Sequence, residues 1–263
     1  MAGFRLPSKG EGAHRLLVAA ILALGSSLFL CTCGIQSTIE YFFPPNLYVI
    51  TSSFSFVLSH NSSNSNAGFA GYDLYYRAFD SYSNAQTALS NLQTLASSTT
   101  SQTPYTVLNT LTATPSSSTQ LNSGYVRVFN GKGQDGDPDT GQRPFFAISQ
   151  GSTWTIFQPN SGQGPSVSDL TFPYTNWYFT VGTDLTEIPV MRYVTSPPGL
   201  SSFEEPFAST DPDYYYSGTG VSTTTFFVFF AVAYGTFFSS SNISTGLSFP
   251  AVLPQVITYT TGY

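Results

Sequence analysis

Residues 224–235 read TTFFVFFAVAYG, and this stretch decides the fold. Side chains alternate in direction along an extended strand, and here both faces are apolar. One face carries Phe227, Phe229, Ala231 and Ala233, and the other carries Phe226, Val228, Phe230 and Val232. The apolar run over residues 226–238 is shorter than the ~20 residues that a membrane-spanning helix needs. We therefore predict a core strand of an antiparallel sheet, covered on its second face by the middle of the chain.

Seven further stretches have strand patterns and are separated by Gly, Pro, Asn and Asp clusters. They are FSFVLSH (54–60), GYDLYYRAF (71–79), YVRVF (125–129), PFFAIS (144–149), STWTIFQ (152–158), NWYFTVG (176–182) and IPVMRYV (188–194). The first two flank a polar turn and are predicted to form a hairpin-like pair. The fold class that follows is mainly all-β, an antiparallel β-sandwich.

One segment has helical rather than strand spacing. Ala85, Ala88, Leu92 and Leu95 repeat at helical intervals, so we predict one helix near residues 83–97, with Ser83 as its N-cap. The Ser/Thr-rich connection that follows is expected to hold one strand, YTVLNTL (105–111), and residues 195–220 are expected to form a long loop.

Charge is scarce in this chain. Charged residues make up 8% of the 263 residues and aromatic residues 16%, with a formal net charge of −6. Removal of residues 1–32 would make the net charge about −8 and leave Lys132 as the one lysine. A negative chain without a basic stripe is not suited to nucleic acid, nor to electrostatic attachment to anionic lipid.

The N-terminal region has the pattern of an export signal. Arg5, Lys9 and Arg15 precede the uncharged segment LLVAAILALGSSLFL (16–30), as in a secretory signal peptide. An uncleaved membrane helix over residues 16–39 is an alternative reading, because that stretch has no charge. The next residues are CTCG (31–34), and a disulfide between the two cysteines would be strained at this spacing.

The stretch LCTCG (30–34) resembles a bacterial lipoprotein box in the relaxed form of spirochaete lipoproteins. The resemblance implies a signal peptide over residues 1–32, lipidation (palmitate) at Cys33 and a tether over residues 33–46. It also implies a location at the bacterial cell envelope, lipid-anchored and either periplasmic or surface-exposed. Because a buried methylene contributes ~0.8 kcal/mol, two or three acyl chains hold a protein stably at a membrane.

Two stretches resemble strands of a fibronectin type III domain. FSFVLSH and GYDLYYRAF are similar to its second and third strands, with Phe56 where the family usually has a tryptophan, and FFVFFAVAYGTFFSSSNISTGLSF (226–249) is similar to its last hairpin. The resemblance implies an immunoglobulin/fibronectin type III-like sandwich over residues 47–250. A β-rich subdomain would be inserted at about residues 81–221, and residues 251–263 would form a C-terminal tail.

Few residues suggest chemistry. Asp135, Asp137 and Asp139 alternate as in the first half of a calcium loop, although Thr140 and Phe146 replace the expected Gly and Glu, so calcium is the one candidate cofactor. A solvated turn explains the same residues. Tyr214, Tyr215 and Tyr216 are candidates for recognition, since tyrosine is favoured in binding loops.

Catalytic sets are weak. His60 is the one histidine left after export and has no nucleophile context. The acidic residues Glu204, Glu205, Asp211 and Asp213 contain pairs that could serve as the two carboxylates of a glycosidase.

We therefore predict an envelope lipoprotein that is not an enzyme and acts as a binding or structural module. Its partners would be the membrane and a protein or carbohydrate ligand. The alternatives are a secreted carbohydrate-active hydrolase with paired carboxylates, and an outer-membrane β-barrel suggested by the terminal VITYTTGY (256–263).

Overall fold

A computed structural model describes most of the chain after residue 40 as one compact unit, Glu40–Tyr263. The described residues are 41–50, 55–65, 68–98, 102–115, 120–130, 146–147, 151–157, 177–195, 198–203, 207–218, 224–238 and 243–260. The unit is built mainly from antiparallel strands, which confirms the predicted fold class of an all-β sandwich.

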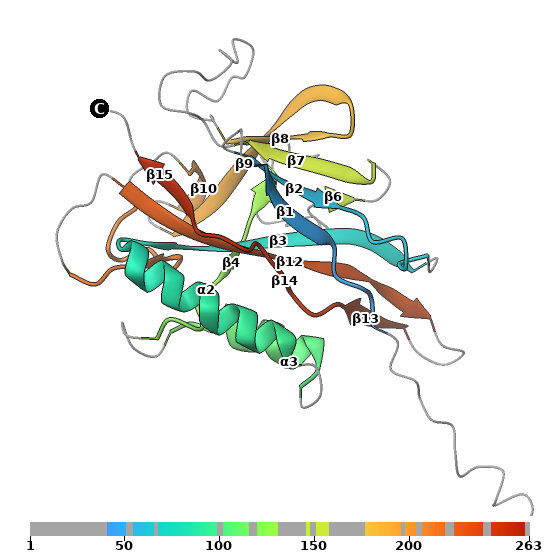
Figure 1. Cartoon of the computed structure of the whole chain (residues 1–263), viewed down its shortest axis with the longest axis horizontal. Helices are drawn as coiled ribbons and strands as arrows, with labels where there is room; N and C mark the ends of the chain where they lie inside the picture. Colours follow the sequence, from blue (N-terminus) through green and yellow to red (C-terminus); the bar gives the residue numbers. More distant parts are fainter. Residues whose placement is uncertain are drawn as a thin grey trace, which may run out of the picture. The chain divides into compact units, whose positions relative to one another are not determined.

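The first sheet has the order β1-β2-β7-β8-β9-β10, with β5 also paired to β9 (Figure 1). Its strands are β1 (Asn46–Ile50), β2 (Ser55–Ser59), β5 (Phe129–Asn130), β7 (Thr153–Phe157), β8 (Tyr178–Val181), β9 (Asp184–Thr195) and β10 (Pro198–Ser202).

The second sheet has the order β11-β3-β12-β13, and β4, β6, β14 and β15 pair with β3 or β12. Its strands are β3 (Phe69–Phe79), β4 (Val126–Arg127), β6 (Phe146–Ala147), β11 (Tyr214–Tyr215), β12 (Thr224–Phe238), β13 (Ile243–Leu247), β14 (Ala251–Val252) and β15 (Ile257–Thr260). The pairs are antiparallel except β11 with β3, which is parallel.

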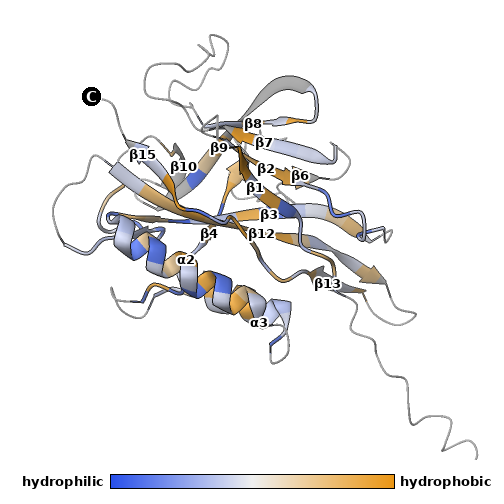
Figure 2. Cartoon of the chain, viewed as in Figure 1, coloured by the Kyte–Doolittle hydropathy of each residue, from blue (hydrophilic) through white to orange (hydrophobic). Residues whose placement is uncertain are grey.

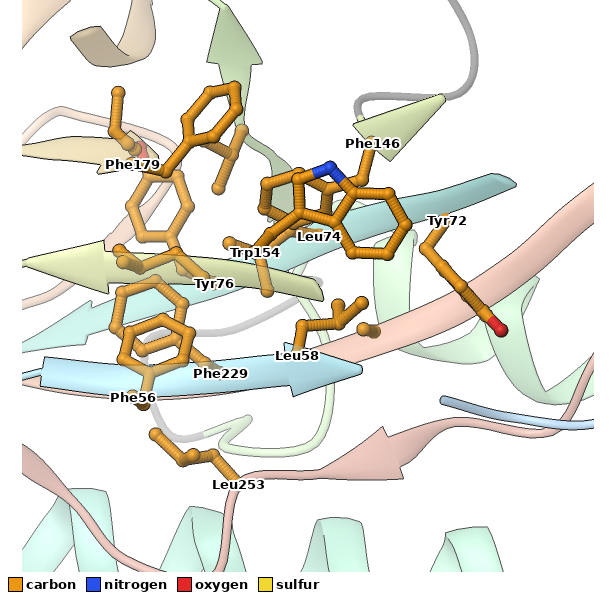
Figure 3. Packing of buried hydrophobic residues seen from close by; sticks show 14 of the residues in the cluster. Phe56, Leu58, Tyr72, Leu74, Tyr76, Phe146, Trp154, Phe179, Phe229 and Leu253 are labelled. Atoms are coloured by element: carbon orange, nitrogen blue, oxygen red, sulfur yellow. The ribbon is translucent and has the colours of Figure 1, made fainter. Parts of the chain in front are cut away.

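The long antiparallel pair β3–β12 is the centre of the unit, and both of its faces are buried, as predicted for residues 226–233. One face packs on the first sheet: the rings of Phe56 on β2 and Phe229 on β12 are 5.1 Å apart, and Trp154 on β7 contacts Tyr72 edge-on. Figure 3 shows these side chains interleaved between the strands. Figure 2 shows hydrophobic residues along the middle of β3 and β12.

Two helices cover the other face of the β3–β12 pair. Helix α2 (Tyr82–Ser97) matches the predicted helix, but its N-cap is Ser81 rather than Ser83. Helix α3 (Pro104–Thr112) occupies the stretch that was predicted as a strand. Thr103 caps α3, and Pro104 occupies its first turn, where a missing N–H costs nothing. Both helices bury apolar side chains against Val228 and Phe230 of β12.

Several other details differ from the sequence predictions. β2 and β3 lie in different sheets rather than forming a hairpin-like pair, because β2 pairs with β1 and β7, whereas β3 pairs with β12. The predicted loop 195–220 contains β10 and β11. Within the unit, residues 81–221 supply strands of both sheets, and residues 251–260 supply β14 and β15, which pair with β12.

The chain crosses between the two sheets at residues 126–130. β4 pairs with β3 in the second sheet, and β5, one residue later, pairs with β9 in the first sheet. Between them, Val128 is buried, and its N–H donates to the carbonyl oxygen of Leu74 at 2.9 Å. One continuous segment therefore joins both sheets.

Candidate functional site

Three segments that are distant in sequence bring charged side chains together in the interior. Arg192 lies on β9, Tyr76 on β3, and Asp211 and Asp213 in the turn before β11. Arg192 Nη1 is 3.0 Å from Asp211 Oδ2 and 3.4 Å from Asp213 Oδ2. The hydroxyl of Tyr76 donates to Asp213 Oδ2, and the ring of Phe207 lies 3.9 Å from the guanidinium carbon of Arg192. We call these five residues the Arg192 cluster.

The turn that presents the two acids is fixed by its own hydrogen bonds. The N–H of Ala208 donates to Asp211 Oδ2 at 2.9 Å, and the N–H of Asp211 donates back to the carbonyl oxygen of Ala208 at 2.9 Å. The carbonyl oxygen of Asp213 accepts from the N–H of Ala78 on β3. The Asp-Pro-Asp sequence at 211–213 is typical of such turns.

Burial controls the protonation of the cluster. Arg192 and Asp213 are 2% and 1% exposed, and burial raises the pKa of Asp213 although Arg192 and Tyr76 act in the opposite direction. Burial, together with the charge of Asp213, raises the pKa of Tyr76 well above its ordinary value. Burial disfavours the charged form of Arg192, but Asp213, Tyr76 and Asp211 outweigh it and raise its pKa.

The geometry of the cluster suits a structural brace better than catalysis. A carboxyl with a raised pKa beside a carboxylate is a common catalytic arrangement. Here, however, both acids engage one guanidinium, and Asp213 is too buried for a sugar to reach it. Because β9 belongs to the first sheet and β3 to the second, the cluster ties the two sheets together.

A second buried arginine lies on the helix-covered face. Arg77 is 2% exposed, and its Nη1 donates to the carbonyl oxygen of Gln120 at 2.9 Å. Its guanidinium carbon lies 5.5 Å and 5.4 Å from the ring centres of Phe79 and Tyr215. Burial lowers the pKa of Arg77. Gly124 has a φ of +79° and approaches Arg77 so closely that a Cβ would lie 3.2 Å from its Cζ.

His60 takes part in a hydrogen-bond network around a buried tyrosine. Its Nδ1 is 3.0 Å from the hydroxyl of Tyr72. That hydroxyl accepts from the N–H of Asn61 and from the side-chain amide of Asn64. Burial lowers the pKa of His60 and raises that of Tyr72. The network positions a loop and resembles no nucleophilic triad.

Phe42 fixes the start of the folded unit. Its ring stacks on Phe237 of β12 at 4.5 Å and meets Phe69 edge-on. Two glycines make the space: a Cβ at Gly235 or Gly246 would lie 2.7 Å or 2.5 Å from this ring. Asn64 secures the same segment, because its side-chain amide donates to the carbonyl oxygen of Phe43 and its Oδ1 accepts from the N–H of Phe43, both at 2.7 Å.

The three tyrosines proposed for recognition lie on and after β11. Tyr214 packs on the core between the sheets, and Tyr215 packs on the core beneath the helices. Tyr216 stacks on Tyr214 at 6.2 Å. All three are half-buried, and burial with the charge of Asp80 and the neighbouring Tyr216 raises the pKa of Tyr214 to about 12.

Several predicted site residues lie outside the described residues. These are Cys33, the calcium candidates Asp135, Asp137 and Asp139, and the acidic pair Glu204 and Glu205. Among the described residues, no group of three or more His, Cys, Asp or Glu side chains is placed to hold a metal ion. In the same part of the chain, no helix has both the length and the apolarity to cross a bilayer.

The sequence reasoning missed Arg192 and Phe42. In IPVMRYV the alternation places Arg192 on the same face as Val190, which is buried, so an inward-facing charge with distant partners could have been expected. Phe42 falls within the predicted tether 33–46, and its aromatic neighbours Tyr41 and Phe43 are the available signal that the segment packs on the unit.

Comparisons with known proteins identify no relative. No family model matches the chain, and neither curated proteins nor solved structures give a match.

Proposed function

We propose that this chain is a lipoprotein of a bacterial envelope, anchored through Cys33, whose β-sandwich serves as a binding or structural module. The observation that carries the proposal is the stretch LFLCTCG (28–34), which ends an uncharged signal-like segment and resembles a lipoprotein box. The ligand class that suits the module is a protein or a carbohydrate.

The use of charge in the folded unit supports a non-enzymatic role. The described acids Asp211 and Asp213 are engaged by Arg192, and Asp73 is paired with Arg127 at 3.7 Å. Carboxylates held in such pairs are engaged within the fold and are not presented to a substrate. Accordingly, the hydrolase alternative gains no support from Asp211 and Asp213.

We also propose that the sandwich is of the immunoglobulin and fibronectin type III kind. In the constant-type immunoglobulin fold, strands A, B, E and D form one sheet and strands C, F and G form the other. The neighbours β1-β2-β7 in the first sheet and β3-β12-β13 in the second support this reading, if they are taken as A-B-E and C-F-G. Helices α2 and α3 on the outer face are additions to that plan.

The anchor is tested by metabolic labelling with radioactive palmitate in a bacterial host that processes lipoproteins. We expect label on the wild-type chain and on Cys31→Ser, and loss of label in Cys33→Ser. The signal peptide of Cys33→Ser should also remain uncleaved, which mass spectrometry of the full chain would detect. Label that persists in Cys33→Ser, or a wild-type chain without label, would overturn the proposed anchor.

A further inference from the structure

The folded unit exposes an apolar patch where the chain first enters it. Tyr41 and Phe43 flank the buried Phe42 and are 40% and 52% exposed. Phe42 itself stacks on Phe237 of β12, next to β13. Figure 1 shows the segment that leads into β1 running beside β13. We call Tyr41 and Phe43 the aromatic patch.

Apart from Glu40, which directly precedes Tyr41, the sequence around the patch carries no charge. Residues 41–59 contain no Asp, Glu, Lys or Arg, and none occurs in residues 214–263, which include all of β12, β13, β14 and β15. Moving this end of the unit into a lipid headgroup region would therefore desolvate no ion from these segments. Tyrosine side chains, which have an apolar ring and a polar hydroxyl, are favoured at the membrane–water interface.

The proposed acylation site is close to the patch along the chain. Cys33 and Phe42 are nine residues apart in the sequence, and fully extended residues span ~3.5 Å each, so the two cannot be separated by more than ~32 Å. Any membrane that holds acyl chains on Cys33 is thus within this distance of the aromatic patch. Because the segment between Cys33 and Phe42 is this short, a lipid surface is the partner that we assign to the patch.

We propose that the aromatic patch rests in the headgroup region of the membrane that holds the anchor, so that the sandwich has a defined orientation at the surface. This inference rests on the proposed lipidation of Cys33. The acyl chains supply the attachment, whereas Tyr41 and Phe43 supply the orientation, because attachment at a single residue does not by itself fix how the unit faces the surface. The opposite end of β12 is directed away from the bilayer.

The chain offers a matched control at that opposite end. Tyr82 begins α2, is 53% exposed and contacts Phe226 near the start of β12. Phe226 and Phe237 lie eleven residues apart on β12, and a strand rises ~3.3 Å per residue, so the two ends are separated by roughly 36 Å. Phe43→Trp and Tyr82→Trp therefore place the same probe on two exposed aromatic positions at opposite ends.

The experiment uses the full chain, acylated in the host and reconstituted into phosphatidylcholine vesicles with and without brominated phosphatidylcholine. The native Trp154 and Trp177 are fully buried and give a constant background, which the wild-type chain measures. We expect Phe43→Trp to add emission that is blue-shifted in vesicles and quenched by brominated lipid. Tyr82→Trp should add emission that is neither shifted nor quenched.

The outcomes separate the patch from the anchor. Acylated protein that floats with the vesicles but shows no bromine quenching at position 43, or equal quenching at positions 43 and 82, overturns the inference and leaves the anchor intact. A blue shift at position 43 without bromine quenching also overturns it, because the probe is then covered by protein, such as a second copy. Wild-type chain that neither carries acyl groups nor floats refutes the anchor and the inference together.

Discussion

Replacement of Arg192 by methionine tests whether the Arg192 cluster braces the two sheets. The substitution keeps a side chain of similar length but leaves the carboxylates of Asp211 and Asp213 without the guanidinium that lies 3.0 Å and 3.4 Å away. Removing one partner of a buried ion pair costs ~3–5 kcal/mol. For a chain of this size each kcal/mol lowers the Tm by roughly 2–4 °C, so we expect a fall of ~6–20 °C.

The loss should depend on pH, because Arg192 acts against the rise in the pKa of Asp213. Without Arg192 that pKa rises further above its value in the unfolded chain. The folded variant then binds a proton more readily than the unfolded chain, so its stability increases as pH falls towards the ordinary carboxyl range. The gap between variant and wild type should therefore be smaller at about pH 5 than at about pH 8.

Urea denaturation followed by tryptophan fluorescence measures the loss of stability and its dependence on pH, since Trp154 and Trp177 are buried in the folded unit. The control is the triple variant Arg192→Met, Asp211→Asn, Asp213→Asn, in which no charge is left unpaired in the cluster. It should be more stable than Arg192→Met alone, because neutral replacement of a whole buried pair is often tolerated. A single variant that loses less than about 1 kcal/mol, or a triple variant less stable than the single one, would refute the brace.

Two further predictions concern the helix cap and alkaline pH. Ser81→Ala should destabilise the chain by ~1 kcal/mol, because Ser81 Oγ accepts from the N–H of Asn84 at 3.4 Å. The control Ser83→Ala should change the urea midpoint little. Equal losses of stability in the two variants would argue against Ser81 as the N-cap. Raised tyrosine pKa values, including about 12 for Tyr214, mean that the unfolded chain releases protons above about pH 10 while the folded chain retains them. The stability of the folded chain should therefore fall as pH rises above about 10, and it should fall less steeply in Tyr76→Phe. Urea midpoints measured at about pH 9 and about pH 11 test this. An equal fall of the midpoint in wild type and variant would contradict the role of Tyr76.

The central strand could be predicted because its sequence pattern is compatible with only one arrangement, a strand buried on both faces. Both faces of residues 226–233 are apolar, so the strand had to be covered twice, and the structure covers it with the first sheet and with α2 and α3. Helix α2 was also predictable, since Ala85, Ala88 and Leu92 repeat at helical spacing and are buried. The position of its N-cap could not be predicted, because Ser81 and Ser83 are two residues apart and carry the same type of capping side chain.

The errors arose where local preference and tertiary contacts disagree. The stretch 105–111 is rich in Tyr, Thr and Val, which favour strands, but Thr103 and Pro104 start a helix, and Val107, Leu108 and Leu111 bury one side of it. Strand pairing could not be predicted from the local sequence either, because β3 pairs with β12 across more than a hundred residues. The Arg192 cluster has the same origin: its acids and its arginine come from separate segments, and no short motif contains them.

The crossing at residues 126–130 has a consequence for how the unit comes apart. Because β4 and β5 are hydrogen-bonded to different sheets and are one residue apart in the chain, neither sheet can open along this margin without disturbing the other. The unit should thus behave as a single cooperative block, with the amide hydrogens of Val128 and Leu74 exchanging with solvent only through the global unfolding reaction. A crossing segment of this kind also occupies backbone groups that would otherwise invite strand addition by a neighbouring chain.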